Sequence, residues 1–221
     1  MSAPHIVVYS RTTGYRHDSI PAGVTAFSEL AAGRGIDVTA TEDPDVLAAR
    51  IPGSAAVVFL STSGAVLTGA GRDALRAHLA GGGGFVGVHA ASTTEYDWPW
   101  YGDDLVGAVF DGHPPVQEGT AVVADRDHPA TAHLPERWEV TDEWYDFKAS
   151  PSGRVRVLAS ADESTYSGGR MGADHPLVWC HENAGGRSFY TALGHRAESY
   201  AEPVFRQHLL GGLLWAARIG E

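Results

Sequence analysis

The segment Phe85–His89, with the sequence FVGVH, decides the fold class because it is apolar on both faces of the strand that it predicts. Two similar apolar runs precede it along the chain, Ile6–Tyr9 and Ala55–Leu60. Helical patterns separate the three runs, and the glycines Gly81–Gly84 end the last of these helices. Strands buried on both faces and alternating with helices are typical of a parallel sheet that is covered on both sides. The sequence therefore predicts an α/β fold.

The remaining elements follow the same alternation. The glycine-rich stretch Ser164–Asp174 is longer than most connections and predicts a loop that belongs to a binding site. The pattern within Trp138–Ser160 predicts strands, one of which carries residues Asp142 to Tyr145. Further strands are expected at Ile36–Ala40, Gly119–Ala124, Leu177–His181 and Ser188–Leu193, and helices from Asp18 or Ser19, from Pro44, over Leu67–Leu79 and around Phe205, Leu209, Leu213 and Ala217.

The composition fits a globular protein and limits its partners. With 221 residues, 43% of them hydrophobic, and no repeat or linker, the chain predicts one domain over residues 1–221. A formal net charge of −11 disfavours nucleic acid, because an acidic surface repels phosphates. The single cysteine, Cys180, excludes an internal disulfide, and the sequence has no signal-peptide pattern or membrane-spanning run. We therefore expect a cytoplasmic protein without membrane or nucleic-acid partners, either a monomer or a homo-oligomer.

Histidines follow several predicted strands at one edge of the sheet. His17 lies in the loop after the first strand, His89 closes the strand that begins at Phe85, and His195 follows the last strand. Ligands of parallel sheets bind at the carboxyl ends of the strands, where the loops converge. His113, in an irregular segment, is expected to fold over the same edge. We predict that His17, His89 and His195 are catalytic or, with a water, bind a divalent metal such as zinc.

Each of these histidines also has a structural interpretation. His17 fits a loop or helix-capping residue, and His89 fits a buried imidazole that is held by hydrogen bonds. His195 follows Gly194, which would let the chain turn sharply and present the ring. The sequence alone leaves both interpretations open.

Glu143 is the carboxylate best suited to acid–base chemistry, because burial among its aromatic neighbours would raise its pKa. The alternative is a surface acid that pairs with an arginine. The sequence also suggests aromatic platforms for sugar rings, although the same side chains would serve to anchor a long loop to the core. The residues assigned to substrate binding are His113, Asp142, Trp144, Tyr145, Tyr96 and Trp98.

Five stretches, taken together and in order, carry a family resemblance: Tyr9–His17, Gly83–Ala91, Phe110–Pro114, Asp142–Tyr145 and Ala192–His195. They resemble the ThuA-like (trehalose utilisation) family of the class I glutamine amidotransferase-like superfamily. The resemblance implies a flavodoxin-like, three-layer α/β/α sandwich with a mostly parallel sheet. It places His89 at the turn where amidotransferases carry a nucleophilic cysteine. Because Cys180 lies in a different predicted strand, we do not expect glutamine hydrolysis through a thiolate.

The resemblance also implies a carbohydrate partner, with disaccharides or keto-sugars as substrates. Our leading hypothesis is an enzyme in which His89 and Glu143 transfer protons, while His17 and His195 orient the sugar or bind a metal. The rival hypothesis is a non-catalytic sugar-binding or regulatory module with the same cleft. A third interpretation is a hydrolase of another substrate class with the same acid–base pair, because such sites look alike across substrates.

Overall fold

The computed structural model describes residues 3–220, which form a nine-stranded sheet and a separate two-stranded sheet. The strands are β1 (His5–Tyr9), β2 (Asp37–Thr41), β3 (Ala56–Leu60), β4 (Gly84–Val88), β5 (Phe110–Gly112), β6 (Gln117–Val123), β7 (Arg137–Asp142), β8 (Asp146–Phe147), β9 (Arg156–Asp162), β10 (Pro176–His181) and β11 (Ser188–Thr191). The helices are α1 (Ile20–Ala32), α2 (Pro44–Arg50), α3 (Gly69–Ala80) and α4 (Pro203–Ala216), with short η1 (His89–Thr93), η2 (Trp100–Val106), η3 (Glu163–Thr165) and η4 (Ala197–Ala201).

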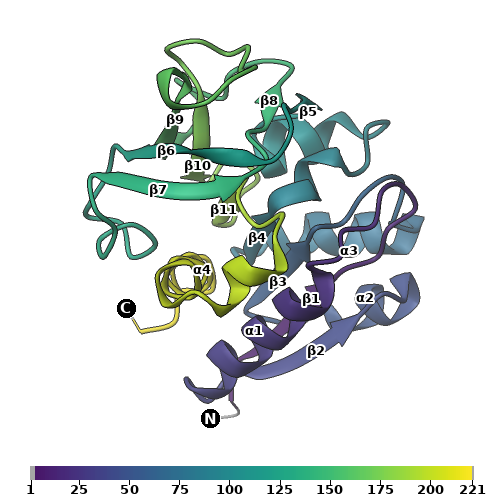
Figure 1. Cartoon of the computed structure of the whole chain (residues 1–221). Helices are drawn as coiled ribbons and strands as arrows, with labels where there is room; N and C mark the ends of the chain where they lie inside the picture. The colour runs from purple at the N-terminus through teal and green to yellow at the C-terminus, as the bar shows by residue number, and fades with distance from the viewer. Residues whose placement is uncertain (1–2, 221) are drawn as a thin grey trace.

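The large sheet has the strand order β2-β1-β3-β4-β11-β10-β9-β6-β7 and divides into two halves (Figure 1). Strands β2, β1, β3, β4 and β11 pair with one another in parallel, and we call them the parallel half. Strands β10, β9, β6 and β7 each run antiparallel to their neighbours, and we call them the antiparallel half. The small sheet pairs β5 with β8. The predicted α/β fold is confirmed, with the antiparallel half as its extension.

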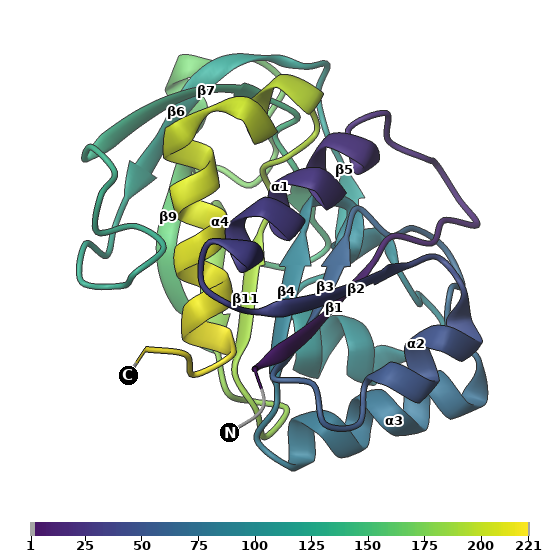
Figure 2. The ribbon, with the colours of Figure 1, turned by 90° about the horizontal axis from the view of Figure 1, so that it is seen from below.

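The inner strands of the parallel half are buried on both faces, as their apolar runs predict, whereas its edge strand β2 has no buried residue. Every residue of β3 and of β4 is buried. Helices α1 and α4 pack together on one side of the sheet, and α2 and α3 pack together on the other (Figure 2). This arrangement is the predicted three-layer sandwich. Among the described residues, no helix is both long and apolar enough to cross a bilayer.

Local signals explain where the helices begin. The Asp43 side chain accepts hydrogen bonds from the first backbone N–H groups of α2, and Thr68 caps α3 in the same way. These caps satisfy donors that a helix leaves unpaired at its start. Helix α1 instead carries Pro21 in its first turn, where the missing N–H of proline is harmless. The helices that cover the sheet are thus fixed at their N-termini by the sequence itself.

Two expected strands are wrong in detail. The strand expected at Phe85–His89 ends at Val88, because His89 adopts a φ of 52° and turns into η1. The strand expected to carry Asp142 to Tyr145 ends at Asp142, and the chain leaves the sheet before β8 starts at Asp146. The physical reason is that the Asp142 carboxylate accepts backbone hydrogen bonds from outside the sheet, as described below.

Candidate active site

A pocket of about 450 Å³ opens at the carboxyl ends of the parallel strands. Its wall combines loops that follow β1, β3 and β4 with segments next to β5, β7 and β8. The two halves of the large sheet therefore both contribute to it. The lining residues are Gly14, Tyr15, His17, Ser63, Gly64, Thr93, Tyr96, Phe110, His113, Glu143 and Tyr145.

Three imidazoles and one carboxylate converge beside this pocket. The Nε2 atoms of His17 and His89 lie 3.1 Å apart. The Oε2 atom of Glu143 lies 3.3 Å from Nε2 of His89 and 3.2 Å from Nδ1 of His195. We call these four residues the histidine–glutamate cluster. The structure thus brings together the four residues that the sequence assigns to catalysis.

His89 is fixed by both its ring and its backbone. Its Nδ1 atom donates to the carbonyl of Ala192 at 2.7 Å, so its Nε2 atom faces the cluster. The Tyr190 hydroxyl donates to the His89 carbonyl at 2.8 Å and holds the turn in place. A positive φ in a non-glycine residue costs on the order of 1–3 kcal/mol. His89 therefore leaves β4 in a sharp turn that points its ring into the cluster.

Asp142 ties together the two chain segments that carry Glu143 and His195. Its Oδ2 atom accepts the backbone N–H of Gly194 at 2.8 Å. Its Oδ1 atom accepts the N–H of Glu143 at 2.8 Å and that of His195 at 3.2 Å. Gly194 has a φ of 122°, and a side chain there would meet the hydroxyl of Tyr200. Asp142, predicted to bind substrate, instead positions two members of the cluster.

Burial and mutual contact shift the pKa values in the cluster. Burial, followed by the neighbouring His89 ring, lowers the pKa of His17 to about 3. Burial raises the pKa of Glu143, but the adjacent His195 and His89 imidazoles outweigh it, so this pKa lies well below its ordinary value. The Glu143 carboxylate raises the pKa of His195. The burial-raised pKa expected for Glu143 is therefore wrong, because imidazoles surround the carboxylate more closely than apolar groups do.

The donor set of the cluster fits a divalent metal. One nitrogen or oxygen from each of its four residues lies within 4.8 Å of the others. Ligands at about 2.1 Å from a tetrahedral zinc ion are separated by about 3.4 Å, which is close to the distances observed here. The bond from His89 Nδ1 to Ala192 is the outer contact that metal-binding histidines need, and it leaves Nε2 of His89 facing the cluster.

Tyr145 links the cluster to the open part of the pocket. Its hydroxyl lies 2.9 Å from Nε2 of His89, and its ring packs against that of His89 with centroids 4.4 Å apart. The His113 ring stacks on the other side of Tyr145, with centroids 5.6 Å apart. His113 Nε2 also lies 3.5 Å from Oε1 of Glu143. Glu143 therefore faces the cluster with one oxygen and His113 with the other.

The predicted site residues divide into those that line the pocket and those that do not. His17, His113, Glu143, Tyr145 and Tyr96 line it. His89 is fully buried and His195 is partly exposed; both lie in the cluster and not among the lining residues.

Two of the predicted aromatic residues lie outside the pocket. Trp144 is buried, stacks on Tyr166 with centroids 4.6 Å apart and donates its indole N–H to the carbonyl of Gln117. Trp98 packs against Trp100, with centroids 4.9 Å apart, and beneath two arginine side chains. Neither ring is placed to stack on a ligand in the pocket. They anchor chain segments, which is the alternative that the sequence left open.

Two aromatic residues that line the pocket, Tyr15 and Phe110, were not predicted as site residues from the sequence. Tyr15 is 68% exposed, packs edge-on against His17 and lies two residues before it in the first loop. Phe110 packs on Tyr145 with centroids 4.5 Å apart. The first could have been found, because an exposed aromatic beside a site histidine is a signal in itself. The second could not, because its contact joins segments far apart in the chain.

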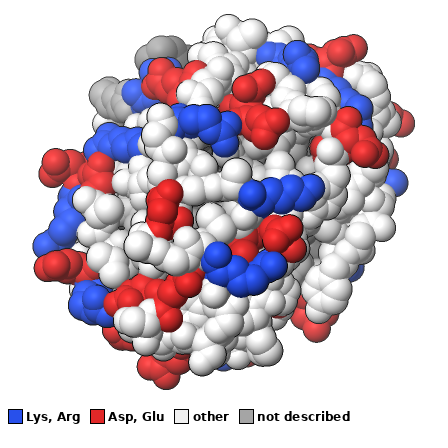
Figure 3. Space-filling model, turned by 90° about the horizontal axis from the view of Figure 1, so that it is seen from above, with Lys and Arg blue, Asp and Glu red and all other residues white. Residues whose placement is uncertain are grey.

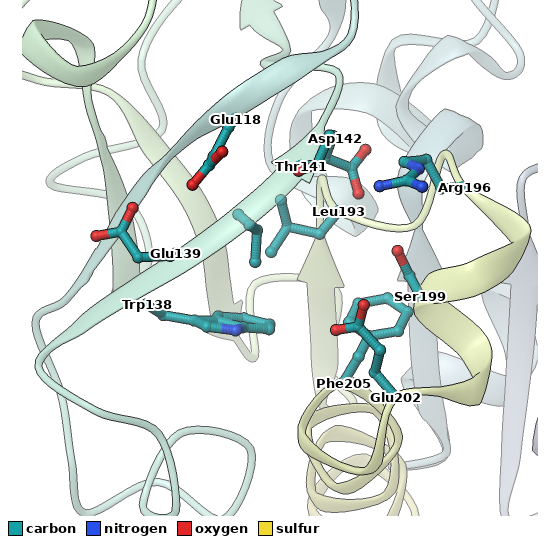
Figure 4. A pocket seen from close by; sticks show the side chains of 11 residues that line it. Glu118, Trp138, Glu139, Thr141, Asp142, Leu193, Arg196, Ser199, Glu202 and Phe205 are labelled. Atoms are coloured by element: carbon teal, nitrogen blue, oxygen red, sulfur yellow. The ribbon is translucent and has the colours of Figure 1, made fainter.

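A second cavity, of about 140 Å³, lies between β7 and η4 (Figure 4). Trp138 and Phe205 form part of its wall, and Asp142 and Arg196 lie on one side of it. The loop Ser164–Asp174, expected to belong to a binding site, lines neither this cavity nor the histidine pocket. Asp142 therefore stands between the cluster and the second cavity.

Charge on the surface is mixed in sign. Figure 3 shows Lys and Arg interspersed with Asp and Glu over the face that it draws. Several of these charges pair with one another, for example Arg170 with Asp111 at 3.0 Å. On that face the described residues form no continuous basic patch.

The chain is an α/β protein with a pocket at the carboxyl edge of its parallel strands. The family model ThuA, described as trehalose utilisation, matches residues 5–216. The chain therefore belongs to the ThuA family, and the sequence-based identification is confirmed. Membership implies a role in carbohydrate metabolism.

Solved structures support the same assignment. A ThuA-like protein of Bacteroides uniformis is 27% identical, with a TM-score of 0.82 over 98% of this chain and 93% of that one. A ThuA-like protein of Parabacteroides merdae is 21% identical, with a TM-score of 0.79 over 97% and 90% of the two chains. A β-galactosidase of Bacillus circulans, 16% identical with a TM-score of 0.60, shares the fold over 97% of this chain and 31% of its own. No curated protein sequence matches the chain.

Proposed function

We propose that this protein is a cytoplasmic enzyme that acts on a disaccharide or keto-sugar by acid–base chemistry. The observation that carries the proposal is the cluster itself. Three imidazoles and a carboxylate, joined by contacts of 3.1 to 3.3 Å, stand beside a pocket of about 450 Å³ with aromatic residues in its wall. Aromatic faces suit sugar rings, and such a concentration of ionisable groups at a pocket is typical of catalytic sites.

Glu143 is the proton-transferring group in this proposal. It lines the pocket and is ionised, and because its pKa lies well below the ordinary value, a proton taken from a hydroxyl or from a carbon next to a carbonyl would pass on to a neighbouring imidazole and not stay on Glu143. His113 lies beside its Oε1 atom and is 34% exposed, so it can exchange protons between Glu143 and a bound ligand. His89, fully buried, acts on Glu143 and Tyr145 and does not touch the substrate.

His17, His89 and His195 would hold a divalent metal in this proposal. Such an ion, when bound, supplies a Lewis acid for a carbonyl oxygen. The residues then divide the work: the three imidazoles hold the ion, Glu143 moves the proton and Asp142 fixes the distance between His195 and Glu143. Tyr15 and Tyr96, which are both exposed at the pocket, are placed to pack against the sugar ring.

The test is product analysis with purified protein, with and without zinc, on disaccharides and on their keto forms. We expect turnover that His89→Ala abolishes while the fold is kept, and that His133→Ala, an exposed histidine outside the pocket, leaves unchanged. Unchanged activity of His89→Ala on a verified substrate would overturn the assignment. Calorimetry that shows binding of the same sugars without conversion would favour the rival, a non-catalytic sugar-binding module.

A further inference from the structure

A second group of ionisable side chains lies behind Tyr145, outside the histidine–glutamate cluster. It consists of Asp146, Glu163 and His175, whose nitrogen and oxygen atoms lie within 4.8 Å of one another. His175 is fully buried. This group comes from β8, from η3 and from the end of the loop Ser164–Asp174, and the proposed function does not use it.

Each ring nitrogen of His175 has a close oxygen acceptor, a glutamate oxygen at Nδ1 and a backbone carbonyl at Nε2, and the Tyr166 hydroxyl is a third, more distant neighbour of Nδ1. Its Nδ1 atom lies 2.7 Å from Oε1 of Glu163, and its Nε2 atom lies 2.8 Å from the carbonyl oxygen of Tyr145. A neutral imidazole has one N–H group and cannot donate to both. A ring turned by 180° would place carbon atoms against these oxygens, well inside the 3.3 Å or so at which C–H groups approach oxygen.

Glu163 accounts for the location of the proton. Its Oε1 atom also accepts the backbone N–H groups of Met171 and Gly172, each at 2.9 Å. An oxygen that accepts three hydrogen bonds carries no proton itself, because a protonated oxygen would need to donate. The proton between Glu163 and His175 therefore belongs to the ring.

Most of the atoms in this group that could bind a metal ion already have hydrogen-bond partners within the protein. Asp146 accepts the backbone N–H of Arg170 with one oxygen and its Nε–H with the other, each at 3.0 Å. Both nitrogens of His175 and the Oε1 atom of Glu163 are occupied as well. The other ionisable neighbours of His175 are Tyr166, whose hydroxyl lies 3.1 Å from Nδ1 of His175, and Asp174, the preceding residue in the sequence.

We infer that His175 is a buried imidazolium, a positioning residue that holds the Tyr145 carbonyl and so aims the Tyr145 hydroxyl at His89. The segment between β7 and β8 has no sheet partners of its own. Asp142 holds its first residue, Glu143, and His175 holds its last, Tyr145. The glycine-rich loop thus supports the site from behind, although it does not line the pocket. Only the importance of the Tyr145–His89 contact rests on the proposed function.

Ring nitrogen NMR tests the charge directly and needs no substrate. The spectrum that correlates the ring protons with both ring nitrogens is recorded at about pH 8.5. This pH is about two units above the ordinary histidine pKa. We expect the His175 ring to stay protonated on both nitrogens, whatever the state of His195, whose pKa Glu143 also raises, and we expect Glu163→Gln to convert the His175 ring to one with a bare nitrogen. His175→Gln should remove the signal and so assign it. A His175 signal with one bare nitrogen in the unaltered protein would overturn the inference.

The His89 ring signal tests the positioning role. Because the Tyr145 hydroxyl lies 2.9 Å from Nε2 of His89, Glu163→Gln and His175→Gln should both shift that nitrogen. The matched control is Tyr166→Phe, which removes the other polar group at His175 Nδ1 and should leave His175 doubly protonated and His89 unshifted. Unshifted His89 signals in both Glu163→Gln and His175→Gln would overturn the positioning role. A protein without turnover but with these shifts would refute the proposed function alone.

Discussion

The parallel and antiparallel halves of the large sheet differ in how they are buried and in what they supply to the site. Strands β3 and β4 of the parallel half are buried along their whole length, whereas β7 and β9 of the antiparallel half have two buried residues each; β10, next to the parallel half, is again fully buried, and the edge strand β2 is not. The imidazoles of His17, His89 and His195 follow strands of the parallel half. Glu143 and Tyr145 come from the segment that leaves the antiparallel half after β7.

The parallel half therefore determines where the site lies, and the antiparallel half adds further reactive groups to it. A parallel sheet brings the ends of its strands to one edge, so its histidines meet because of the topology. The Glu143 carboxylate and the Tyr145 hydroxyl reach the site only because individual hydrogen bonds hold the segment between β7 and β8 outside the sheet. Asp142, bonded to Glu143 on one side and to Gly194 and His195 on the other, joins the two contributions.

The largest effect should come from removing one group of each half. We expect Glu143→Gln and His17→Gln each to lower kcat/KM about 10³-fold, because each removes a member of one acid–base unit. The double variant should be little worse than either single one, since groups that act as a unit are not additive. Product formation followed by NMR measures this. If Glu143→Gln kept more than about a tenth of the activity, the antiparallel half would supply no chemistry.

The sequence predicts the parallel half well because its signals are local. Two-faced apolar runs indicate buried parallel strands, and the rule that ligands bind at their carboxyl ends brings His17, His89 and His195 together. The structure adds what the rule does not contain. The turn at His89 depends on Ala192 and Tyr190, which lie about a hundred residues away, so no local pattern shows that its ring is buried.

The antiparallel half is harder to predict because its decisive contacts are long-range. The run Asp142 to Tyr145 looks like a strand, but the Asp142 carboxylate takes up backbone groups of Gly194 and His195 and ends β7. The loop Ser164–Asp174 looks like a site loop, but Arg170 ties it to Asp146 and away from the pocket. In both segments the residue types indicate a role at the site. Whether the segment forms a strand, lines the pocket or supports it depends on tertiary contacts.

The next largest effect should come from weakening the hydrogen bonds by which Asp142 joins the two halves. Asn in place of Asp142 keeps one acceptor oxygen and turns an NH2 group towards backbone N–H donors. We expect Asp142→Asn to lower activity about 10- to 100-fold and stability by about 2 kcal/mol, because a buried charge-assisted network is broken. Activity assays and urea unfolding measure the two effects. Asp162→Asn, at the end of β9, is the control and should leave activity unchanged. Equal activities of Asp142→Asn and the unaltered protein would show that these hydrogen bonds are not needed to position Glu143 and His195.

A smaller effect concerns a histidine on the antiparallel side. The His208 ring packs against Trp138 of β7, with centroids 5.4 Å apart, and donates to the carbonyl of Ala130 at 2.8 Å. Burial lowers the pKa of His208 to about 4. Between that value and the ordinary pKa of about 6.5, the unfolded chain binds a proton that the folded one does not. Stability is therefore present in full above about pH 6.5 and falls as the pH falls.

For His208 alone, this linkage costs about 2 kcal/mol between pH 7 and pH 5. Urea unfolding of His208→Gln at both pH values measures it, because the variant lacks this proton and should lose less stability on acidification. The exposed His133, replaced in His133→Gln, is the control and should leave the pH dependence as it is in the unaltered protein. A His208→Gln variant that loses as much stability as the unaltered protein would show that folding does not lower the pKa of His208.

The smallest effect is a matched pair of core substitutions that compares the halves directly. Val58 is fully buried at the centre of β3, where it pairs with Val8 and Val86. Val140 is half-buried in β7, where it pairs with Gly119. Val58→Ala should cost about 2 kcal/mol, because it removes two buried methyl groups and leaves a cavity between helices on both faces. Val140→Ala should cost less than about 1 kcal/mol, because water can fill the space. Equal losses in urea unfolding would mean that the antiparallel half is packed as tightly as the parallel half, and its partial exposure would then not explain why its strands are harder to predict.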